Sequence, residues 1–273
     1  MRNATAGPSP AHSAPPAALQ DPPAASRSPP GPGRILYGLY AWLQFMLIGL
    51  VCLALLLVLF PLKRRRALVR RLSRVALRLA GMRVRTAALA GLPLPCVVVA
   101  NHCSYLDGVV LAAALPSDFG FVIKREMFSV PFAGALLTRI GAEFVERRDQ
   151  ARVMRDTRRL MRHALAGQAL AFFPEGTFSA EVGLLRFHIG AFAAAARANL
   201  PVVPVAIRGT RHCLPPGSAW PAPGPIDVRV LAPLPALAPG AVDDGSRAAA
   251  LRGQARAALL AELGEPDLDA RCA

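Results

Sequence analysis

The longest apolar stretch in the chain runs from residue 35 to residue 62. It carries no charged residue, and Gln44 is its one strongly polar interruption. About 20 apolar residues are enough to cross the hydrocarbon core of a bilayer, so the pattern predicts a membrane-inserted helix over residues 34–62. A cleaved signal peptide fits poorly, because the stretch is too long, lies far from Met1 and is not followed by a small-residue cleavage site. Length alone does not decide between full crossing and partial insertion.

A strongly basic segment follows at residues 63–80. Its apolar positions recur at helical spacing, whereas Arg66, Arg70 and Arg74 step by four along another face. This pattern predicts an amphipathic helix on the surface of an anionic membrane. A helix of the soluble domain with a solvated arginine face is the alternative. By the positive-inside rule, the basic residues after the apolar stretch also predict that the following domain faces the cytoplasm.

From residue 81 onward, short β-rich stretches alternate with helical patterns. Such alternation predicts an α/β sheet covered by helices, in one domain over residues 81–273. Residues 1–33 are rich in Pro, Ala, Ser and Gly and lack apolar periodicity, so we expect a disordered tail there. The expected strands are 96–100, 119–123, 144–146, 169–173, 202–207 and 226–231, and the expected helices are 106–115, 151–166, 190–198 and 247–263.

Composition narrows the class of partner without choosing one. The 273 residues are 53% apolar and carry a formal net charge of +15, which predicts attraction to nucleic acid, phospholipid headgroups or a phosphorylated substrate. The five cysteines are scattered, without the paired spacing of a zinc site or a disulfide framework, and fit a reducing cytosol. There is no glycine-rich nucleotide motif and no metal-ligand pattern, so we expect neither a cofactor nor a metal.

Candidate chemistry begins directly after the expected strand 96–100, where Asn101 and His102 precede Asp107. Positions five apart on one continuous helix point about 140° away from each other, so a contact requires His102 in the strand-to-helix turn and Asp107 in the first helical turns. A carboxylate partner fixes the tautomer of an imidazole and stabilises its protonated form, as a general base requires. Taken alone, this spacing is better explained by an Asp that supports the helix start and a His that bonds within a turn.

A second motif, Phe-Pro-Glu-Gly-Thr at residues 173–177, follows the expected strand 169–173. It places the Glu175 carboxylate, Gly176 and the Thr177 hydroxyl at the C-terminal end of that strand, where ligands bind in open α/β sheets. Gly176 permits a close backbone approach, and Glu175 suits holding a glycerol hydroxyl or ordering neighbouring basic residues. An ordinary strand-ending turn is the alternative for this motif by itself.

Taken together and in order, the two motifs resemble the glycerolipid acyltransferase family typified by 1-acylglycerol-3-phosphate acyltransferases. The family motif N-H-x4-D matches Asn101, His102 and Asp107, and F-P-E-G-T matches residues 173–177. The resemblance covers roughly residues 80–235 and implies the sheet and helices of that family. Weaker matches are Gly141, Phe144, Val145 and Arg147 for a second block, residues 203–206 for a fourth, and Lys124, Glu126, Pro131 and Gly134 between the first two.

The resemblance also implies roles for the matched residues. His102 would be the general base and Asp107 its orienting partner. Arg147 would bind the phosphate of the acceptor, Lys124 would add a second cation near the phosphate or the acyl carbonyl, and residues 175–177 would shape the acceptor pocket. Arginine suits bidentate phosphate binding, although a solvated strand-end charge at Arg147 and a surface lysine at Lys124 are the alternatives.

The implied reaction moves a fatty acyl group from acyl-CoA or acyl carrier protein to the free hydroxyl of lysophosphatidic acid, giving phosphatidic acid. The donor is a substrate, so the resemblance implies no cofactor. The implied setting is the inner or plasma membrane, with the chain bound among phospholipids and the catalytic domain facing the cytoplasm.

One departure from the family pattern concerns the acceptor. Phe178 stands where many members carry an arginine, which weakens the case for a phosphate monoester, and Arg186 is the candidate to compensate. Another lysophospholipid or a lyso-ornithine lipid therefore stays open as the acceptor. An alternative of a different class is a noncatalytic basic membrane scaffold or nucleic-acid-binding protein. That alternative leaves both motifs unexplained, and we expect no nucleic acid partner.

Overall fold

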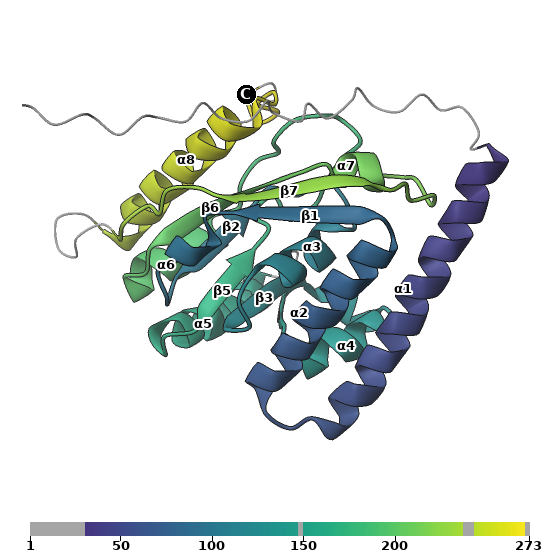
Figure 1. Cartoon of the computed structure of the whole chain (residues 1–273). Helices are drawn as coiled ribbons and strands as arrows, with labels where there is room; N and C mark the ends of the chain where they lie inside the picture. The colour runs from purple at the N-terminus through teal and green to yellow at the C-terminus, as the bar shows by residue number, and fades with distance from the viewer. Residues whose placement is uncertain (1–30, 147–149, 237–242, 271–273) are drawn as a thin grey trace, which may run out of the picture.

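The computed structural model describes residues 31–146, 150–236 and 243–270 (Figure 1). The described chain opens with two long helices, α1 (Pro32–Val58) and α2 (Leu62–Leu79), and continues as a seven-stranded sheet with helices on both faces. Most of the expected tail, residues 1–30, lies outside the described residues.

The sheet runs in the order β1-β7-β6-β2-β5-β3-β4, and all neighbouring strands are parallel except β6 and β7. The central strand β2 is buried on both faces, as the continuous apolar run of a parallel strand predicts. Because their pairings are parallel, β2, β5, β3 and β4 all end at one edge of the sheet. The strands are β1 (Met82–Ala87), β2 (Val97–Ala100), β3 (Phe119–Lys124), β4 (Glu143–Val145), β5 (Ala169–Phe172), β6 (Val202–Arg208) and β7 (Gly224–Val230).

Two hydrophobic cores lie on opposite faces of this sheet. Val98 and Ala100 belong to the core beneath α2 and α3 (Asp107–Ala114), whereas Val97 and Val99 belong to the core beneath α5 (Gln150–Leu165), α6 (Gly190–Ala198) and α8 (Asp244–Leu263). Successive side chains of a strand point to opposite faces, which explains this division. The remaining helical segments are α4 (Ala133–Arg139), α7 (Thr210–Cys213) and the 3₁₀ turns Leu89–Gly91 and Arg125–Ser129.

The predicted α/β class is confirmed, and all six expected strands and four expected domain helices form with bounds shifted by at most three residues. Sequence patterning missed the edge strand β1 and the short helices α4 and α7. In β1, Arg83 and Arg85 are exposed, and among the described strands this weakly apolar strand pairs with β7 alone. Helix α4 has seven residues, too few for a helical period to stand out.

Helix α1 is the one helix in the described part of the chain that is long and apolar enough to cross a membrane. It lies along α2 and the domain, as Figure 1 shows. The Tyr37 hydroxyl donates to the carbonyl of Ala80 at 2.6 Å, and Trp42 Nε1 donates to that of Ala219 at 2.7 Å. Toward its other end, Leu56 is fully buried in a small cluster with Ile140. Both halves of α1 are therefore held against the domain.

The structure corrects the expected orientation of α2. Arg70 and Arg74 donate to the carbonyls of Ala114 and Ala113 at 3.4 and 2.8 Å, and these carbonyls belong to the last turn of α3, where helix carbonyls lack intrahelical partners. Arg66 donates to carbonyls in the loops after α3 and α4. The three stepped arginines thus bind the domain rather than lipid. In the described chain, the α2 arginines that are exposed and make no side-chain hydrogen bond or ion pair are Arg64, Arg71 and Arg78.

Candidate active site

The sequence-predicted contact between His102 and Asp107 is present. His102 lies just beyond β2 and Asp107 is the first residue of α3, and His102 Nδ1 is 2.8 Å from Asp107 Oδ2. The Asp107 side chain is fully buried, whereas 19% of the His102 side chain is exposed. Since Nδ1 faces the carboxylate, Nε2 is the ring nitrogen left to accept a proton from a substrate.

The same carboxylate also builds the turn that carries the histidine. Asp107 Oδ2 accepts hydrogen bonds from the backbone N–H groups of Cys103 at 2.7 Å and Ser104 at 2.8 Å. The Ser104 hydroxyl in turn donates to the carbonyl of Leu214 at 2.8 Å. Asp107 thus pairs with the histidine and also holds the turn that precedes α3.

Asn101 joins two strands at the edge of the sheet that carries His102. Its Nδ2 donates to the carbonyl of Ile207 at 2.9 Å, and its Oδ1 accepts from the N–H of Ile207 at 2.7 Å. The side chain is buried, so the amide takes the place of a backbone partner where β2 ends beside β6. The sequence matched Asn101 to a motif but did not reveal this function.

Glu175 is buried directly behind the histidine. Its Oε1 accepts from the backbone N–H of His102 at 2.6 Å, and its Oε2 accepts from that of Leu185 at 2.8 Å. Burial raises the pKa of Glu175 to about 8, against the opposing effect of these two donors. Both oxygens are thus engaged by backbone groups, an arrangement that suits ordering the site rather than holding a glycerol hydroxyl.

The other members of this motif form the turn around Glu175. Gly176 has φ +72°, in the left-handed region that favours glycine, and its N–H donates to the carbonyl of Phe173 at 3.0 Å. Thr177 is exposed beyond it. The turn after β5 therefore brings the second motif against the first, where Glu175 accepts from the N–H of His102.

Aromatic rings surround the imidazole. Phe173 stacks on the His102 ring at 4.4 Å between centroids, and Phe178 meets the same ring edge-on at 4.6 Å. Phe178 also contacts the exposed Tyr105 at 4.7 Å. The sequence identified Phe178 as a departure from the family pattern, but its contact with the histidine depends on how the turn after β5 folds and was not foreseen.

The structure describes two of the three basic residues that the sequence proposed for phosphate binding, Lys124 and Arg186. Lys124 ends β3 and is exposed at the same sheet edge as His102, two strands away, and it is in register with Val145 on β4. Arg147 lies outside the described residues. Arg186 is exposed and has no hydrogen bond or ion pair within the part of the chain that the structure describes.

A buried arginine that the sequence did not single out holds the loop after Phe178. Arg211, in α7, is 6% exposed, and its NH1 donates to the carbonyls of Ser179 at 3.0 Å and Glu181 at 3.1 Å. No sequence motif marks this residue. Its place after β6 brings it to the active-site end of the sheet, so it supports the loop that presents Phe178.

Comparison with known proteins assigns this arrangement to a class. Residues 83–208 match the model of the Acyltransferase family. The whole fold resembles the crystal structure of the 1-acyl-sn-glycerophosphate acyltransferase PlsC from Thermotoga maritima, with a TM-score of 0.69 at 21% identity, covering 85% of this chain and 95% of that one. By the family model, residues 83–208 are similar to the Acyltransferase family, and the structural likeness shows that the fold is shared.

Within that class, the similarity is to enzymes of lysolipid acylation. The chain is 36% identical over 124 residues to the chloroplastic 1-acyl-sn-glycerol-3-phosphate acyltransferase BAT2 of Brassica napus, covering 45% of this chain and 36% of that protein. It is 33% identical over 183 residues to the lyso-ornithine lipid O-acyltransferase of Rhizobium meliloti, covering 64% and 61%. The chain thus spans about a third and three fifths of these curated relatives. The glycerolipid acyltransferase resemblance found from the motifs is confirmed for this domain.

Proposed function

We propose that this chain is an O-acyltransferase that moves a fatty acyl group from a thioester donor to the free hydroxyl of a lysolipid, with lysophosphatidic acid as the first candidate acceptor. The observation that carries the proposal is the 2.8 Å contact between His102 Nδ1 and Asp107 Oδ2 at the carboxyl end of β2. This contact leaves Nε2 as the proton-accepting nitrogen beside an aromatic wall.

The chemistry is direct attack by the acceptor. Nε2 of His102 removes the proton of the acceptor hydroxyl while its oxygen attacks the thioester carbonyl, and Asp107 stabilises the imidazolium that forms. Collapse of the tetrahedral intermediate breaks the C–S bond, and the departing thiolate takes the proton back from Nε2. The products are a new oxygen ester and a free thiol, so this scheme draws on acyl-CoA or acyl carrier protein as a substrate and on no cofactor.

We assign the acceptor phosphate to Lys124, at the end of β3, and to Arg147, the arginine of the matched motif block. Arg147 lies outside the described residues, so its part in this assignment rests on the family resemblance alone. A guanidinium suits bidentate binding of a phosphate monoester. We also propose that the turn of residues 175–177 shapes the acceptor pocket, because its glycine allows a ligand to approach closely.

An acceptor without a phosphate monoester is the second candidate. Phe178 packs against the base at 4.6 Å in the position where many members of the family place a cation. An aromatic side chain there contributes apolar contact and no charge. The similarity to a lyso-ornithine lipid O-acyltransferase points the same way.

We place the reaction at a membrane surface. The face of α1 turned away from the domain carries exposed apolar side chains, among them Leu36, Leu43 and Leu47 at 71, 70 and 60% exposure. Because α1 is held along its length by α2 and the domain, full crossing would draw the domain into the hydrocarbon. An insertion that buries this face in one leaflet, at the inner or plasma membrane with the domain on the cytoplasmic side, avoids that cost.

Product analysis by mass spectrometry tests the proposal. Full-length protein in mixed micelles is given acyl-CoA or acyl carrier protein donors and a panel of lysolipids, with His102→Ala as the control. Phosphatidic acid from the wild type alone supports the first candidate, and product from another lysolipid supports the second. Equal product from the His102→Ala variant would overturn the assigned base, and no product across the panel from folded protein favours a noncatalytic scaffold.

A further inference from the structure

Helix α5 carries a row of arginines that the proposed chemistry does not use. Arg155, Arg158 and Arg162 are exposed, and within the described residues none of them forms an ion pair or a hydrogen bond through its side chain. Arg159 behaves differently, because it pairs with Glu143 at 2.8 Å and with Asp156 at 2.9 Å. The α5 basic face, defined as Arg155, Arg158 and Arg162, thus presents charge that the protein itself leaves uncompensated.

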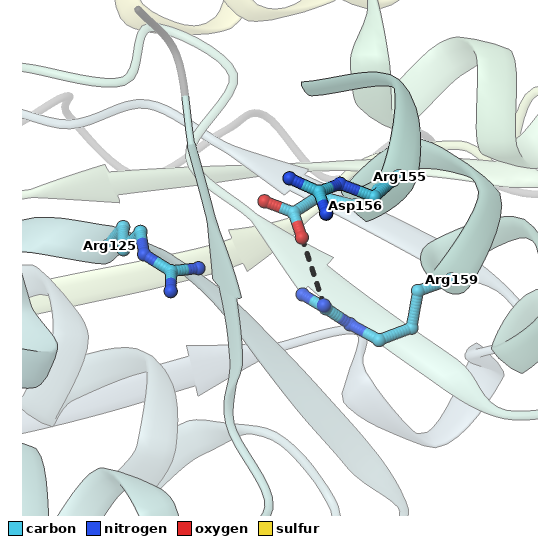
Figure 2. A pocket seen from close by; sticks show the side chains of 4 residues that line it. All are labelled: Arg125, Arg155, Asp156 and Arg159. Atoms are coloured by element: carbon cyan, nitrogen blue, oxygen red, sulfur yellow. Dashed lines mark ion pairs between the residues drawn. The ribbon is translucent and has the colours of Figure 1, made fainter. Parts of the chain in front are cut away.

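The first turns of α5 reach the catalytic edge of the sheet. Asp156 Oδ2 accepts from the backbone N–H of Glu146, the residue after β4, at 2.8 Å. A cavity of about 400 Å³ opens there, with Arg125 on one side and Arg155, Asp156 and Arg159 on the other (Figure 2). Since β4 lies three strands from β2, this cavity is about 14 Å along the edge from the strand that carries the base.

Apolar side chains lie among the arginines farther along the helix. A second hollow of about 850 Å³ is lined by α5 residues that include Met161 and Leu165, together with Arg197 of α6. Leu165 is 63% exposed, and Arg197 stands 4.0 Å from Asp244. A surface that combines arginine with exposed Met and Leu has the composition of a protein–protein interface. A site for a small phosphate ligand does not require the exposed apolar side chains.

This surface faces away from the membrane elements. Leu160 and Ala164 of α5 pack into the core shared with α6 and α8, whereas α2 and α3 cover the opposite face of the sheet. Helix α1 packs on α2 and α4, again away from α5. A partner that binds α5 therefore comes from the aqueous side, as a water-soluble acyl donor does, while the lysolipid arrives from the membrane side.

We propose that the α5 basic face docks an acidic acyl carrier protein, which delivers its thioester along the sheet edge to His102. This inference rests on the proposed function, because it names the donor. The three arginines span about 10 Å of helix, a length that suits a row of carboxylates on a partner helix better than the compact phosphates of CoA. The cavity at Arg125 and Arg155 marks the path by which the donor's prosthetic arm reaches the edge.

Donor-resolved kinetics test the proposal. The variant Arg158→Glu/Arg162→Glu is compared with the wild type in steady-state assays that use either acyl carrier protein or acyl-CoA as donor. We expect KM for the carrier-protein donor to rise about tenfold or more, with kcat and the acyl-CoA kinetics retained. The matched control is Arg83→Glu/Arg85→Glu, which makes the same charge change on β1, the opposite edge strand, and should leave both donors unaffected. Thermal unfolding of all three proteins verifies folding.

A binding measurement keeps the result independent of turnover. The His102→Ala protein is titrated with fluorescently labelled holo acyl carrier protein at two salt concentrations, with and without the α5 substitutions. Binding that weakens with salt and with the α5 substitutions supports the proposal, since the contacts are solvent-exposed and screened. Equal losses of kcat/KM with both donors would assign the arginines to phosphate binding and overturn carrier docking. Unchanged kinetics with the carrier-protein donor would also overturn it. Absence of product with either donor would defeat the proposed function, and the binding titration would still decide the docking surface.

Discussion

His102 Nδ1 and Asp107 Oδ2 lie 2.8 Å apart, and the same Asp107 oxygen accepts two backbone N–H groups of the intervening turn. The carboxylate therefore both pairs with the proposed base and holds the turn that carries it. Substituting it disturbs both, whereas substituting the histidine disturbs the chemistry alone. Comparing variants of the two residues therefore distinguishes the loss of a general base from the loss of fold stability.

The first prediction uses that separation. His102→Ala should lower kcat by a factor on the order of 10² to 10⁴, the usual contribution of a positioned general base, with little change in thermal unfolding. Asp107→Ala should lower kcat and also destabilise the fold by roughly 2–5 kcal/mol, because two buried backbone donors lose their partner. Steady-state kinetics and thermal unfolding of both variants check this. A His102→Ala protein that keeps full turnover would exclude the assigned base.

Asn101 provides the second prediction. Its amide makes two buried hydrogen bonds to Ile207 at 2.9 and 2.7 Å, and alanine would leave the N–H and carbonyl of Ile207 without their partner. We expect Asn101→Ala to lower the free energy of unfolding by about 2–4 kcal/mol. Chemical denaturation in detergent measures this loss. Ser104→Ala is a useful comparison of similar cost, because the Ser104 hydroxyl also makes two buried hydrogen bonds: it donates to the carbonyl of Leu214 at 2.8 Å and accepts from the N–H of Leu106 at 3.2 Å.

The third prediction concerns pH. Burial raises the pKa of Glu175 from 4.5 to about 8, so between these values the folded state binds the proton more tightly than the unfolded state does. Stability should therefore fall as pH rises from about 4.5 to about 8, by roughly 1 kcal/mol per pH unit from this group, and level off above that range. Thermal unfolding across this range should show the slope in the wild type.

The Glu175→Gln variant isolates this effect. Glutamine cannot titrate, and it also loses one of the two acceptor contacts, to His102 or Leu185, at a cost that does not vary with pH. The variant should thus be less stable overall but show a shallower decline between pH 5 and 8. Parallel curves for the two proteins would show that Glu175 is ionised throughout and that its burial is compensated.

The sequence predicted the class of fold and the contact between His102 and Asp107, because both depend on local patterns. Strand β2 is a continuous apolar run, and the His–Asp spacing requires a strand-to-helix turn that the pattern itself indicated. The sequence did not predict the hydrogen bonds made by Asn101 and Arg211, because their partners lie about 106 and 30 residues away along the chain. Helical periodicity likewise grouped Arg66, Arg70 and Arg74 on one face without showing what that face meets.

Phe178 leads to the fourth prediction, on acceptor choice. Its ring meets His102 at 4.6 Å and carries no charge. Phe178→Arg should raise kcat/KM for lysophosphatidic acid relative to lyso-ornithine lipid by roughly ten- to a hundredfold, since a hydrogen bond to a charged group is worth about 1.5–3 kcal/mol. The ratio is the measure, because a new cation beside His102 also disfavours the imidazolium and slows both reactions. Phe178→Leu controls for loss of the ring and should leave the ratio near its original value.

The two sets of α2 arginines provide the fifth prediction. Arg70 and Arg74 bind the last carbonyls of α3, so replacing both with alanine should lower the unfolding temperature and leave vesicle affinity unchanged, provided the protein is folded at the assay temperature. The exposed arginines should behave in the opposite way, because each contributes about 1 kcal/mol to binding an anionic membrane without supporting the fold. The second variant replaces Arg64, Arg71 and Arg78 with alanine.

Flotation with vesicles of graded anionic lipid content, run beside thermal unfolding, distinguishes the two variants. The triple variant should need more anionic lipid for half-maximal binding, and the difference should shrink as salt is raised, because exposed charges are screened. Residual binding at high salt would then come from the apolar face of α1, which these substitutions leave intact. If the triple variant bound vesicles as the wild type does, α2 would be a helix of the domain alone, and membrane attachment would rest on α1.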